Sequence, residues 1–283
     1  MIGLLSKKAR SKIVAAAILI FLGILITLFF SSSSFATHDG EEDSKDDPGP
    51  DTGDGSICEP IICIDPGHGG TANGSAGCGI GAAGWDDMVQ VGKAWKYNSS
   101  RPPNEKNFNL GISSRLSGLF TSLTDYDVVM TRNSDYCVSL KRRVQIANAR
   151  NCTVFLSVHN NAAGSSAGIN PRESGTETLY KDSEDEELAG YVQAALVKKI
   201  HRRNRGLIFR DNLYVINKQP RRPSIIVEVG FVTNSTEFYN LSNPRFQQLA
   251  AVGIFNGTQN YLDANWVADS SCFNSSIDSL AKK

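Results

Sequence analysis

The sequence predicts a single α/β domain whose helices pack against a central, largely parallel or mixed sheet. Short runs rich in β-branched residues alternate along the chain with longer runs whose apolar residues recur at helical spacing. No internal repeat interrupts that alternation. Strands and helices in alternating order are typical of a sheet covered by helices.

Six runs are expected to form the strands of this sheet. Each is short and largely apolar, and most lie next to polar or turn-forming residues. The predicted strands are Ile61–Asp65, Asp127–Thr131, Val154–Val158, Thr176–Tyr180, Leu213–Ile216 and Ile225–Val229.

Four segments are expected to be helices. The first opens at Asn104, which can cap a helix, and then carries Phe108, Ile112 and Leu116 at intervals of four residues. The last opens at Pro244, since proline is favoured in a first helical turn. The predicted helices are Asn104–Leu123, Ser139–Arg150, Glu184–His201 and Pro244–Leu262.

The composition is that of a globular protein. The chain has 283 residues, is 41% hydrophobic and has a formal net charge of zero. That hydrophobic content is enough for a core, and the absence of a basic excess argues against a protein that binds nucleic acid. We therefore expect a globular monomer without a nucleic-acid partner.

The N-terminal part differs from the rest. Residues 1–12 are short and basic, and residues 13–30 form an apolar run of about the length that crosses a hydrocarbon core. The run is either an uncleaved signal-anchor or a signal peptide cleaved near Ser34–Ala36. Both alternatives place the following chain outside the cytoplasmic membrane. We expect residues 31–55 to be a disordered acidic linker, residues 56–265 the folded domain and residues 266–283 a tail.

Six cysteines are compatible with an exported protein. None lies in a C-x-x-C pair, which argues against a structural zinc knuckle. Cys58 and Cys272 could join the two ends of the domain, but the sequence leaves the pairing open. Cys63 lies within a predicted strand and is expected to be a core residue.

Polar side chains at strand ends give the first indication of function. His68, in "DPGHGG", and His159, in "SVHNN", each follow or end a predicted strand, and such ends meet in one crevice of an open α/β sheet. Two histidines and a carboxylate are a common ligand set of hydrolytic zinc sites. Glu105, in the first turn of a helix, is the best candidate for the carboxylate. Its alternatives are Asp86 and Asp87, in a segment that reads as irregular.

Glu228 places a carboxylate inside the apolar strand "SIIVEVGF". An unpaired charge is costly there. An ion pair with an arginine would explain it, and so would a general base whose pKa is raised by burial. The base is the better explanation, because burial beside a metal-bound water would bring its pKa into the range useful for a general base.

Other patterns are weaker. "GIGAAG" (79–84) lacks the preceding strand of a dinucleotide site, and "GSSAG" (164–168) lacks the strand and helix of a nucleophile elbow. A basic cluster is either a solvated edge or a patch for an anionic substrate. It consists of Arg202, Arg203, Arg205, Arg210, Lys218, Arg221 and Arg222.

Four motifs together resemble the zinc-dependent N-acetylmuramoyl-L-alanine amidases that cut peptidoglycan. They are "IDPGHGG", "NEKNFNL", "VVMTRNSDYCVSLKRRVQIANARNCTVFLSVHNNA" and "IIVEVGFVTN", and the resemblance extends over Ile61–Leu262. The resemblance implies a twisted six-stranded sheet with flanking helices. It also implies that His68, Glu105 and His159 bind one Zn²⁺ per chain and that Glu228 is the catalytic base.

By the same resemblance, the expected reaction is cleavage of the amide bond between N-acetylmuramic acid and L-alanine. The partner would be peptidoglycan, met outside the cytoplasmic membrane, with residues 13–30 as an anchor if they are uncleaved. A zinc peptidase acting on the stem peptide and an inactive wall-binding protein are the alternatives.

The segment 71–103 is longer than is usual in the family. The segment after His159 is short, so no inhibitory helix is expected there, and Asn161 is expected to shape this loop or to donate to substrate.

Overall fold

The computed structural model describes residues 59–70, 88–91, 94–97, 105–165, 168–219 and 222–267. All of them belong to one unit, Pro50–Lys283. The predicted membrane segment (13–30), the linker (31–55) and most of the tail (266–283) lie outside these ranges. Within the described ranges, no helix is long and apolar enough to cross a membrane.

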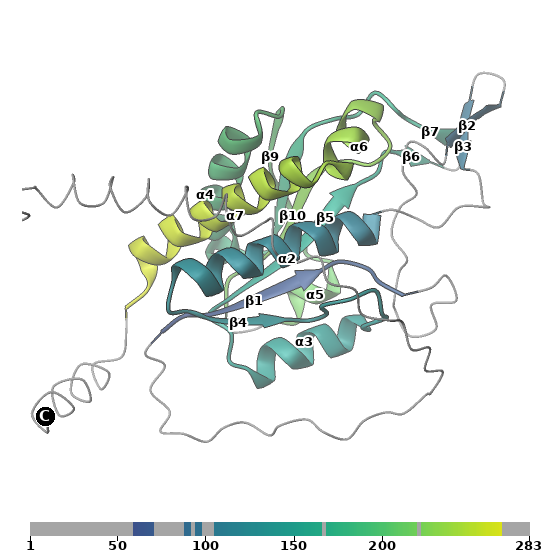
Figure 1. Ribbon diagram of the computed structural model, residues 1–283. Helices are drawn as coiled ribbons and strands as arrows, with labels where there is room; N and C mark the ends of the chain where they lie inside the picture. Colours follow the sequence, from purple (N-terminus) through teal and green to yellow (C-terminus); the bar gives the residue numbers. More distant parts are fainter. Residues whose placement is uncertain are drawn as a thin grey trace, which may run out of the picture. The chain divides into compact units, whose positions relative to one another are not determined.

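A six-stranded mixed sheet organises the fold, as the sequence predicts (Figure 1). In spatial order its strands are β4 (Asp127–Met130), β1 (Ile61–Pro66), β5 (Val154–Asn161), β10 (Ser224–Phe231), β8 (Thr176–Tyr180) and β9 (Asn204–Phe209). The first four are parallel to one another. Strand β8 runs antiparallel to β10, and β9 runs parallel to β8. The carboxyl ends of β1, β5 and β10 therefore share one edge.

The main core lies on one face of this sheet. There, α2 (Glu105–Leu123), α4 (Ser183–Ile200), α6 (Ser235–Ser242) and α7 (Pro244–Asn265) pack against alternate residues of β1, β5 and β10. In α2, the residues Phe108, Ile112, Leu116 and Phe120 recur every four positions and are all buried, which places one apolar stripe on the sheet. Three of the four predicted helices correspond to α2, α4 and α7.

A smaller core covers the opposite face. It is built around α3 (Leu140–Ala149) and the short α5 (Tyr214–Asn217), which contact alternate residues of the same strands. Helix α3 is the fourth predicted helix, and the side chain of Ser139 caps it by accepting from the N–H of Arg142. Figure 1 shows α3 on the side of β1 and β4 away from α2.

One predicted strand is wrong. The residues Leu213–Ile216 do not join the sheet, because Tyr214–Asn217 form α5. The β-branched residues of "LYVI" suit a strand, but Val215 and Ile216 both pack into the same core. Neighbouring side chains of a strand would point to opposite faces, whereas neighbours on a helix can share one. The sixth strand is instead β9, an edge strand whose "NRGLIF" sequence gave little signal. Helix α6 was not predicted either.

A second, four-stranded sheet follows the order β2-β3-β7-β6. Strands β2 (Met88–Val91) and β3 (Ala94–Tyr97) come from the long segment 71–103 and form an antiparallel hairpin. They join β7 (Gly168–Ile169) and β6 (Gly164–Ser165), which follow β5 in the chain. This segment, which reads as irregular in the sequence, thus contains a paired hairpin among its described residues. Asp86 and Asp87 lie outside the described residues.

A disulfide joins Cys63 in β1 to Cys152, just before β5, with their Cα atoms 5.7 Å apart. Cys63 is buried, as expected of a core residue, but the sequence did not predict this bond. Cys137 is also disulfide-bonded. Cys58 and Cys272, the pair considered from the sequence, lie outside the described residues.

Candidate metal centre

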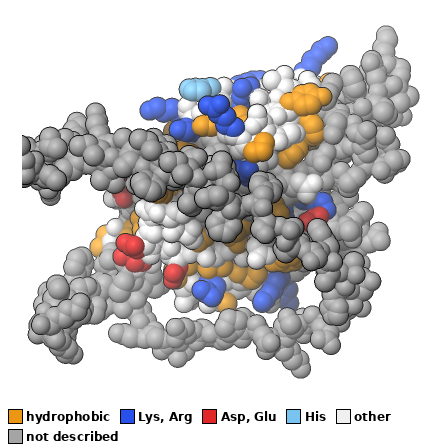
Figure 2. Space-filling model, viewed as in Figure 1, with side chains coloured by type: hydrophobic (Ala, Val, Ile, Leu, Met, Phe, Trp, Pro, Cys, Tyr) orange, Lys and Arg blue, Asp and Glu red, His pale blue; other side chains and the backbone are white. Residues whose placement is uncertain are grey.

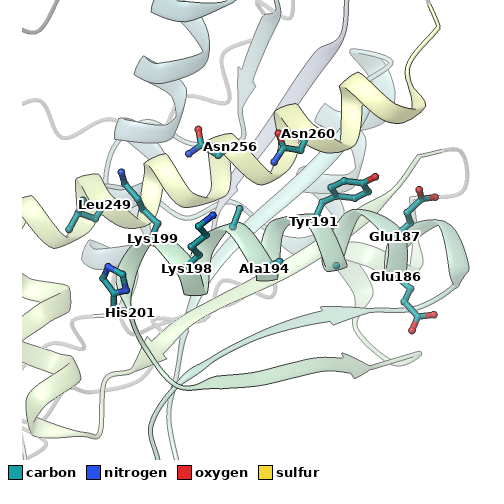
Figure 3. A pocket seen from close by; sticks show the side chains of 12 residues that line it. Glu186, Glu187, Tyr191, Ala194, Lys198, Lys199, His201, Leu249, Asn256 and Asn260 are labelled. Atoms are coloured by element: carbon teal, nitrogen blue, oxygen red, sulfur yellow. The ribbon is translucent and has the colours of Figure 1, made fainter. Parts of the chain in front are cut away.

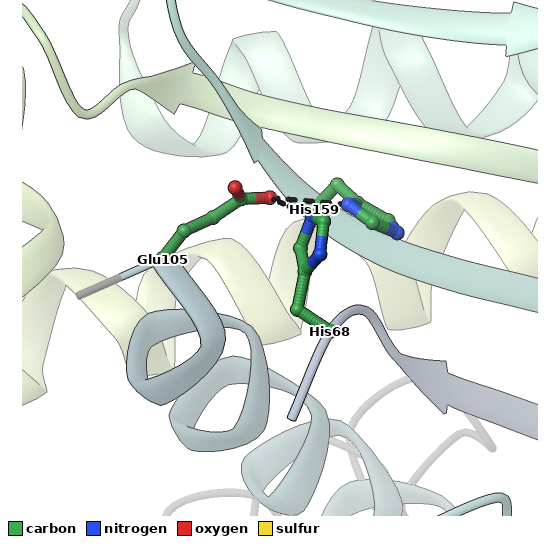
Figure 4. Close-up of side chains that lie close together, drawn as sticks. All are labelled: His68, Glu105 and His159. Atoms are coloured by element: carbon green, nitrogen blue, oxygen red, sulfur yellow. Dashed lines mark hydrogen bonds and ion pairs between the residues drawn. The ribbon is translucent and has the colours of Figure 1, made fainter. Parts of the chain in front are cut away.

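His68, Glu105 and His159 come together at the carboxyl edge of the main sheet (Figure 4). Their nearest ligand atoms all lie within 4.8 Å of one another. Oε1 of Glu105 lies 3.0 Å from Nε2 of His68 and 3.1 Å from Nδ1 of His159. The two imidazole rings meet edge to face, with their centroids 4.8 Å apart. These are the three residues that the sequence predicts as ligands.

The backbone brings each residue to this position. His68 lies in the turn after β1, where its φ of 60° is a left-handed conformation uncommon for a residue with a side chain. His159 lies near the end of β5, which pairs with β1. Between them, Gly67 leaves room for the ring: a Cβ atom at that position would lie 2.2 Å from Nε2 of His159. Glu105 is the first residue of α2.

Glu105 is the buried member of the cluster. Only 4% of Glu105 is exposed. Burial alone would raise its pKa, but hydrogen bonds to His159 and His68 outweigh burial, so the pKa lies well below the usual range for glutamate. The two histidine side chains are partly exposed, 25% and 19%. An ionised carboxylate at the bottom and two imidazoles open to solvent form a site that a cation can enter.

This donor set fits a divalent metal ion. It supplies two imidazole nitrogens and one carboxylate oxygen from three separate elements. The combination matches catalytic zinc sites that keep one position for water or substrate. The fit rests on the distances between donor atoms and on the buried carboxylate.

Glu228 lies beside this cluster. It pairs with His159 in the register of β10 and β5. The residue as a whole is partly exposed, but its Oε2 atom is buried and has no hydrogen-bond partner. Burial, and then the negative charges of Glu105 and Glu177, raise the pKa of Glu228 well above the usual range. Among the described residues no arginine forms the ion pair with Glu228 that was considered from the sequence.

A cavity of about 280 Å³ opens next to the two histidines. Its walls are mostly apolar and include the side chains of α5 and the start of α3. The lining residues are Asp65, Gly67, His68, Leu140, Arg143, His159, Leu213, Tyr214, Val215 and Ile226. A larger hollow of about 1030 Å³ lies between α4 and α7 (Figure 3), and it includes none of the three candidate ligands.

The side chain of Asn161 is hydrogen-bonded at the end of β5. Oδ1 of Asn161 accepts from the N–H of Ala162, and its Nδ2 donates to Glu177, which matches the loop-shaping role considered from the sequence.

In the basic cluster, Arg205 is ion-paired with Glu173 and Glu177, and Arg222 is buried. Basic side chains still gather near α4 (Figure 2), where Lys198 and Arg203 are exposed. Arg221 lies outside the described residues.

A buried polar network behind the histidines was not predicted. Asp65 accepts hydrogen bonds from Thr131, Arg143 and Ser157. Asn109 donates to the carbonyl of Gly67, and Asn160 donates to Asn109. The signal that could have revealed it is Asp65 itself, a carboxylate within an otherwise apolar strand.

The fold and the site define an α/β protein with a candidate three-residue metal centre at the carboxyl ends of its central strands. The chain belongs to the N-acetylmuramoyl-L-alanine amidase family, whose sequence profile matches residues 62–260. The family expected from the four motifs is thus confirmed.

Relatives and solved structures agree with this membership. The chain is 31% identical over 213 residues to the uncharacterized protein YqiI of Bacillus subtilis (strain 168), covering 72% of this chain and 88% of YqiI. It is 29% identical to the N-acetylmuramoyl-L-alanine amidase LytC of the same strain, over 71% of this chain but only 35% of LytC.

Two solved structures share the fold. One is the catalytic domain of CwlV, an N-acetylmuramoyl-L-alanine amidase from Bacillus (Paenibacillus) polymyxa var. colistinus. It is 29% identical with a TM-score of 0.59, over 72% of this chain and 98% of that one. The other is an N-acetylmuramoyl-L-alanine amidase from Clostridium difficile 630, 30% identical with a TM-score of 0.60, over 74% and 99%.

Proposed function

We propose that this chain is a zinc-dependent N-acetylmuramoyl-L-alanine amidase that hydrolyses the amide bond between N-acetylmuramic acid and the L-alanine of the peptidoglycan stem peptide. The observation that carries the proposal is the convergence of His68, Glu105 and His159 within 4.8 Å, with Glu228 in register beside His159. Family membership supplies the bond and the substrate.

In this proposal the three residues hold one Zn²⁺ ion. When bound, the ion would lower the pKa of a water molecule to about 7 and polarise the scissile carbonyl. Glu105 contributes the negative charge of the ligand set, and its burial keeps that charge close to the two imidazoles.

Glu228 is the general base. Its carboxylate accepts a proton from the attacking water, the new C–O bond forms at the lactyl carbonyl carbon, and the C–N bond to alanine breaks. Glu228 then returns the proton to the departing nitrogen, which leaves a carboxylate on the muramic acid and a free amino group on L-alanine. A carboxyl whose pKa is raised by its surroundings is suited to take and return a proton in this way.

We further infer that the domain acts outside the cytoplasmic membrane, with residues 13–30 as its anchor or signal peptide. A disulfide between Cys63 and Cys152 supports this location, because such bonds persist in oxidising compartments.

Zinc content and product identity test the function. The purified full-length chain should hold close to one zinc ion per molecule, and digestion of peptidoglycan should release new L-alanine amino termini. Mass spectrometry of the products distinguishes this bond from bonds within the stem peptide. Cleavage within the stem peptide would contradict the proposal, as would full activity without metal or zinc binding without cleavage.

Replacement of Glu228 tests the base. Glu228→Gln should keep the zinc and lose about 100- to 10,000-fold in kcat, the range expected when a general base is removed. Glu173→Gln is the matched control, because Glu173 is not part of the metal cluster and is ion-paired with Arg205. It should retain activity. A Glu228→Gln enzyme with wild-type kcat would show that another group is the base.

A further inference from the structure

We propose that Arg132 is a positioning residue that holds His68 and Glu105 at the separation needed to bind the metal. Arg132 follows β4 and is buried, with 1% of its surface exposed. Among the described residues its guanidinium donates only to backbone carbonyl groups. Three of these carbonyls, those of Pro66, Gly67 and Lys106, belong to the segments that carry the two ligands, and the fourth is that of Ser134.

One nitrogen atom makes the central connection. Nη2 of Arg132 donates to the carbonyl of Gly67 and to the carbonyl of Lys106, both at 2.9 Å. Gly67 directly precedes His68, and Lys106 directly follows Glu105. The same atom therefore joins the turn after β1 to the first turn of α2, next to the 3.0 Å contact between His68 and Glu105.

The turn needs such support because its conformation is unfavourable. His68 has a φ of 60°, which costs energy for a residue with a Cβ atom. Nε of Arg132 donates to the carbonyl of Pro66 at 2.9 Å. A second buried arginine, Arg143, donates to the carbonyls of Pro66 and His68, both at 2.8 Å. Three consecutive carbonyl groups are thus held by two guanidinium groups.

His159 does not depend on Arg132 in the same way. It is fixed by the pairing of β5 with β10 and β1. Loss of Arg132 should therefore leave one ligand in place and loosen the other two relative to it. Residues that orient metal ligands from behind typically change metal affinity by about 10- to 100-fold when they are replaced.

The role of Arg132 rests on the proposed zinc site, so the test measures zinc affinity directly. In the purified full-length chain, Arg132→Met removes every donor and should weaken Zn²⁺ binding by about 10- to 100-fold, as measured by competition with a chromogenic chelator. The absorption spectrum of the Co²⁺-loaded protein should also change, because the ligand geometry changes.

A matched control separates positioning from general stability. Arg222 is also a buried arginine, but it donates to the side chains of Asn148 and Gln219, away from the ligands. Arg222→Met should lower the unfolding temperature while leaving the Zn²⁺ affinity and the Co²⁺ spectrum unchanged. Equal losses of affinity in the Arg132 and Arg222 variants would overturn the positioning role.

Arg132→Lys decides the matter if Arg132→Met does not fold. Lysine keeps the positive charge but presents its donors from one nitrogen, so it cannot reach the carbonyls of Pro66, Gly67 and Lys106 together. It should therefore still bind Zn²⁺ more weakly than the wild type. Wild-type affinity in a folded Arg132 variant would overturn the positioning role alone. Failure of the wild-type protein to bind Zn²⁺ would overturn the proposed function as well.

Discussion

The two faces of the six-stranded sheet carry different side chains, although the same strands supply both. On the face covered by α2, α4 and α7, the central strands present apolar residues that are wholly buried. They include Ile62, Ile64, Leu156 and Val227. At the alternate positions, on the face covered by α3 and α5, the same strands present a disulfide and polar groups. These are Cys63, Asp65, Ser157, His159 and Glu228.

The two faces therefore have different roles: the face covered by α2, α4 and α7 mainly stabilises the domain, and the face covered by α3 and α5 carries the candidate site. Side chains of a strand alternate between faces, so each central strand contributes to a large apolar core and to the candidate site at once. The second face has a smaller core and leaves a cavity of about 280 Å³ beside the histidines. Hydrogen bonds, an ion pair and a disulfide compensate there for the smaller apolar contact.

The sharpest test of the polar face is the buried carboxylate of Asp65. Burial alone would raise the pKa of Asp65, but the charge of Arg143 and hydrogen bonds from Thr131 and Ser157 outweigh it, so the pKa is lowered. Asp65→Asn should lower the free energy of unfolding at pH 7 by about 3–5 kcal/mol, because it leaves Arg143 buried without its partner. Urea denaturation measures the loss.

The pH dependence of the free energy of unfolding provides a second test of Asp65. A carboxyl whose pKa is lower in the folded state stabilises the protein above its unfolded pKa of about 4, and this contribution is lost as the pH falls through the lower folded value. The Asp65→Asn variant should therefore lose less stability than the wild type as the pH falls below about 4. Asp125→Asn, at an exposed position, is the control. A pH profile of Asp65→Asn parallel to that of the wild type would contradict the role of this ion pair.

Neighbouring residues of β5 test the two faces directly. Leu156 is wholly buried in the main core, and Ser157 donates to Asp65 on the other face. Leu156→Ala should lower the free energy of unfolding by about 2–5 kcal/mol through the cavity it leaves. Ser157→Ala should cost about 1.5–3 kcal/mol, the range for a hydrogen bond to a charged group.

These two variants should also differ in zinc affinity. Chemical denaturation gives the stabilities, and chelator competition gives the affinity for Zn²⁺. Leu156→Ala should bind Zn²⁺ as the wild type does under conditions where it is folded. Ser157→Ala should bind Zn²⁺ more weakly, because it removes a hydrogen bond from the network behind His68. A loss of zinc affinity confined to Leu156→Ala would show that the division between the faces is wrong.

The sequence predicts the apolar face better than the polar one. All four predicted helices and five of the six predicted strands follow from periodicity. In α2, for example, Phe108, Ile112 and Leu116 repeat at the spacing of a buried stripe. Strand β9 escaped because an edge strand needs few apolar residues. Tyr214–Asn217 appeared as a strand because propensity does not show that Val215 and Ile216 pack on the same face.

The candidate ligands could be found because histidines at strand ends are rare in this chain. The polar network behind them could not be found from the sequence. Arg132 and Arg143 act through backbone carbonyls, and no local pattern marks a side chain that reaches a carbonyl 65 or 75 positions away in the chain. The same holds for Cys63 and Cys152, which are 89 positions apart.

The remaining test of the polar face concerns that disulfide, which links Cys63 in β1 to Cys152 just before β5. Disulfides typically contribute about 2–4 kcal/mol to the free energy of unfolding, chiefly by restricting the unfolded chain. The double variant Cys63→Ala/Cys152→Ala should show this loss in urea denaturation. In excess reductant the wild type also loses the bond, so the difference between the two proteins should shrink to the packing effect of two small side chains. A difference that persists unchanged in reductant would assign the loss to packing, and the polar face would then depend on its hydrogen bonds alone.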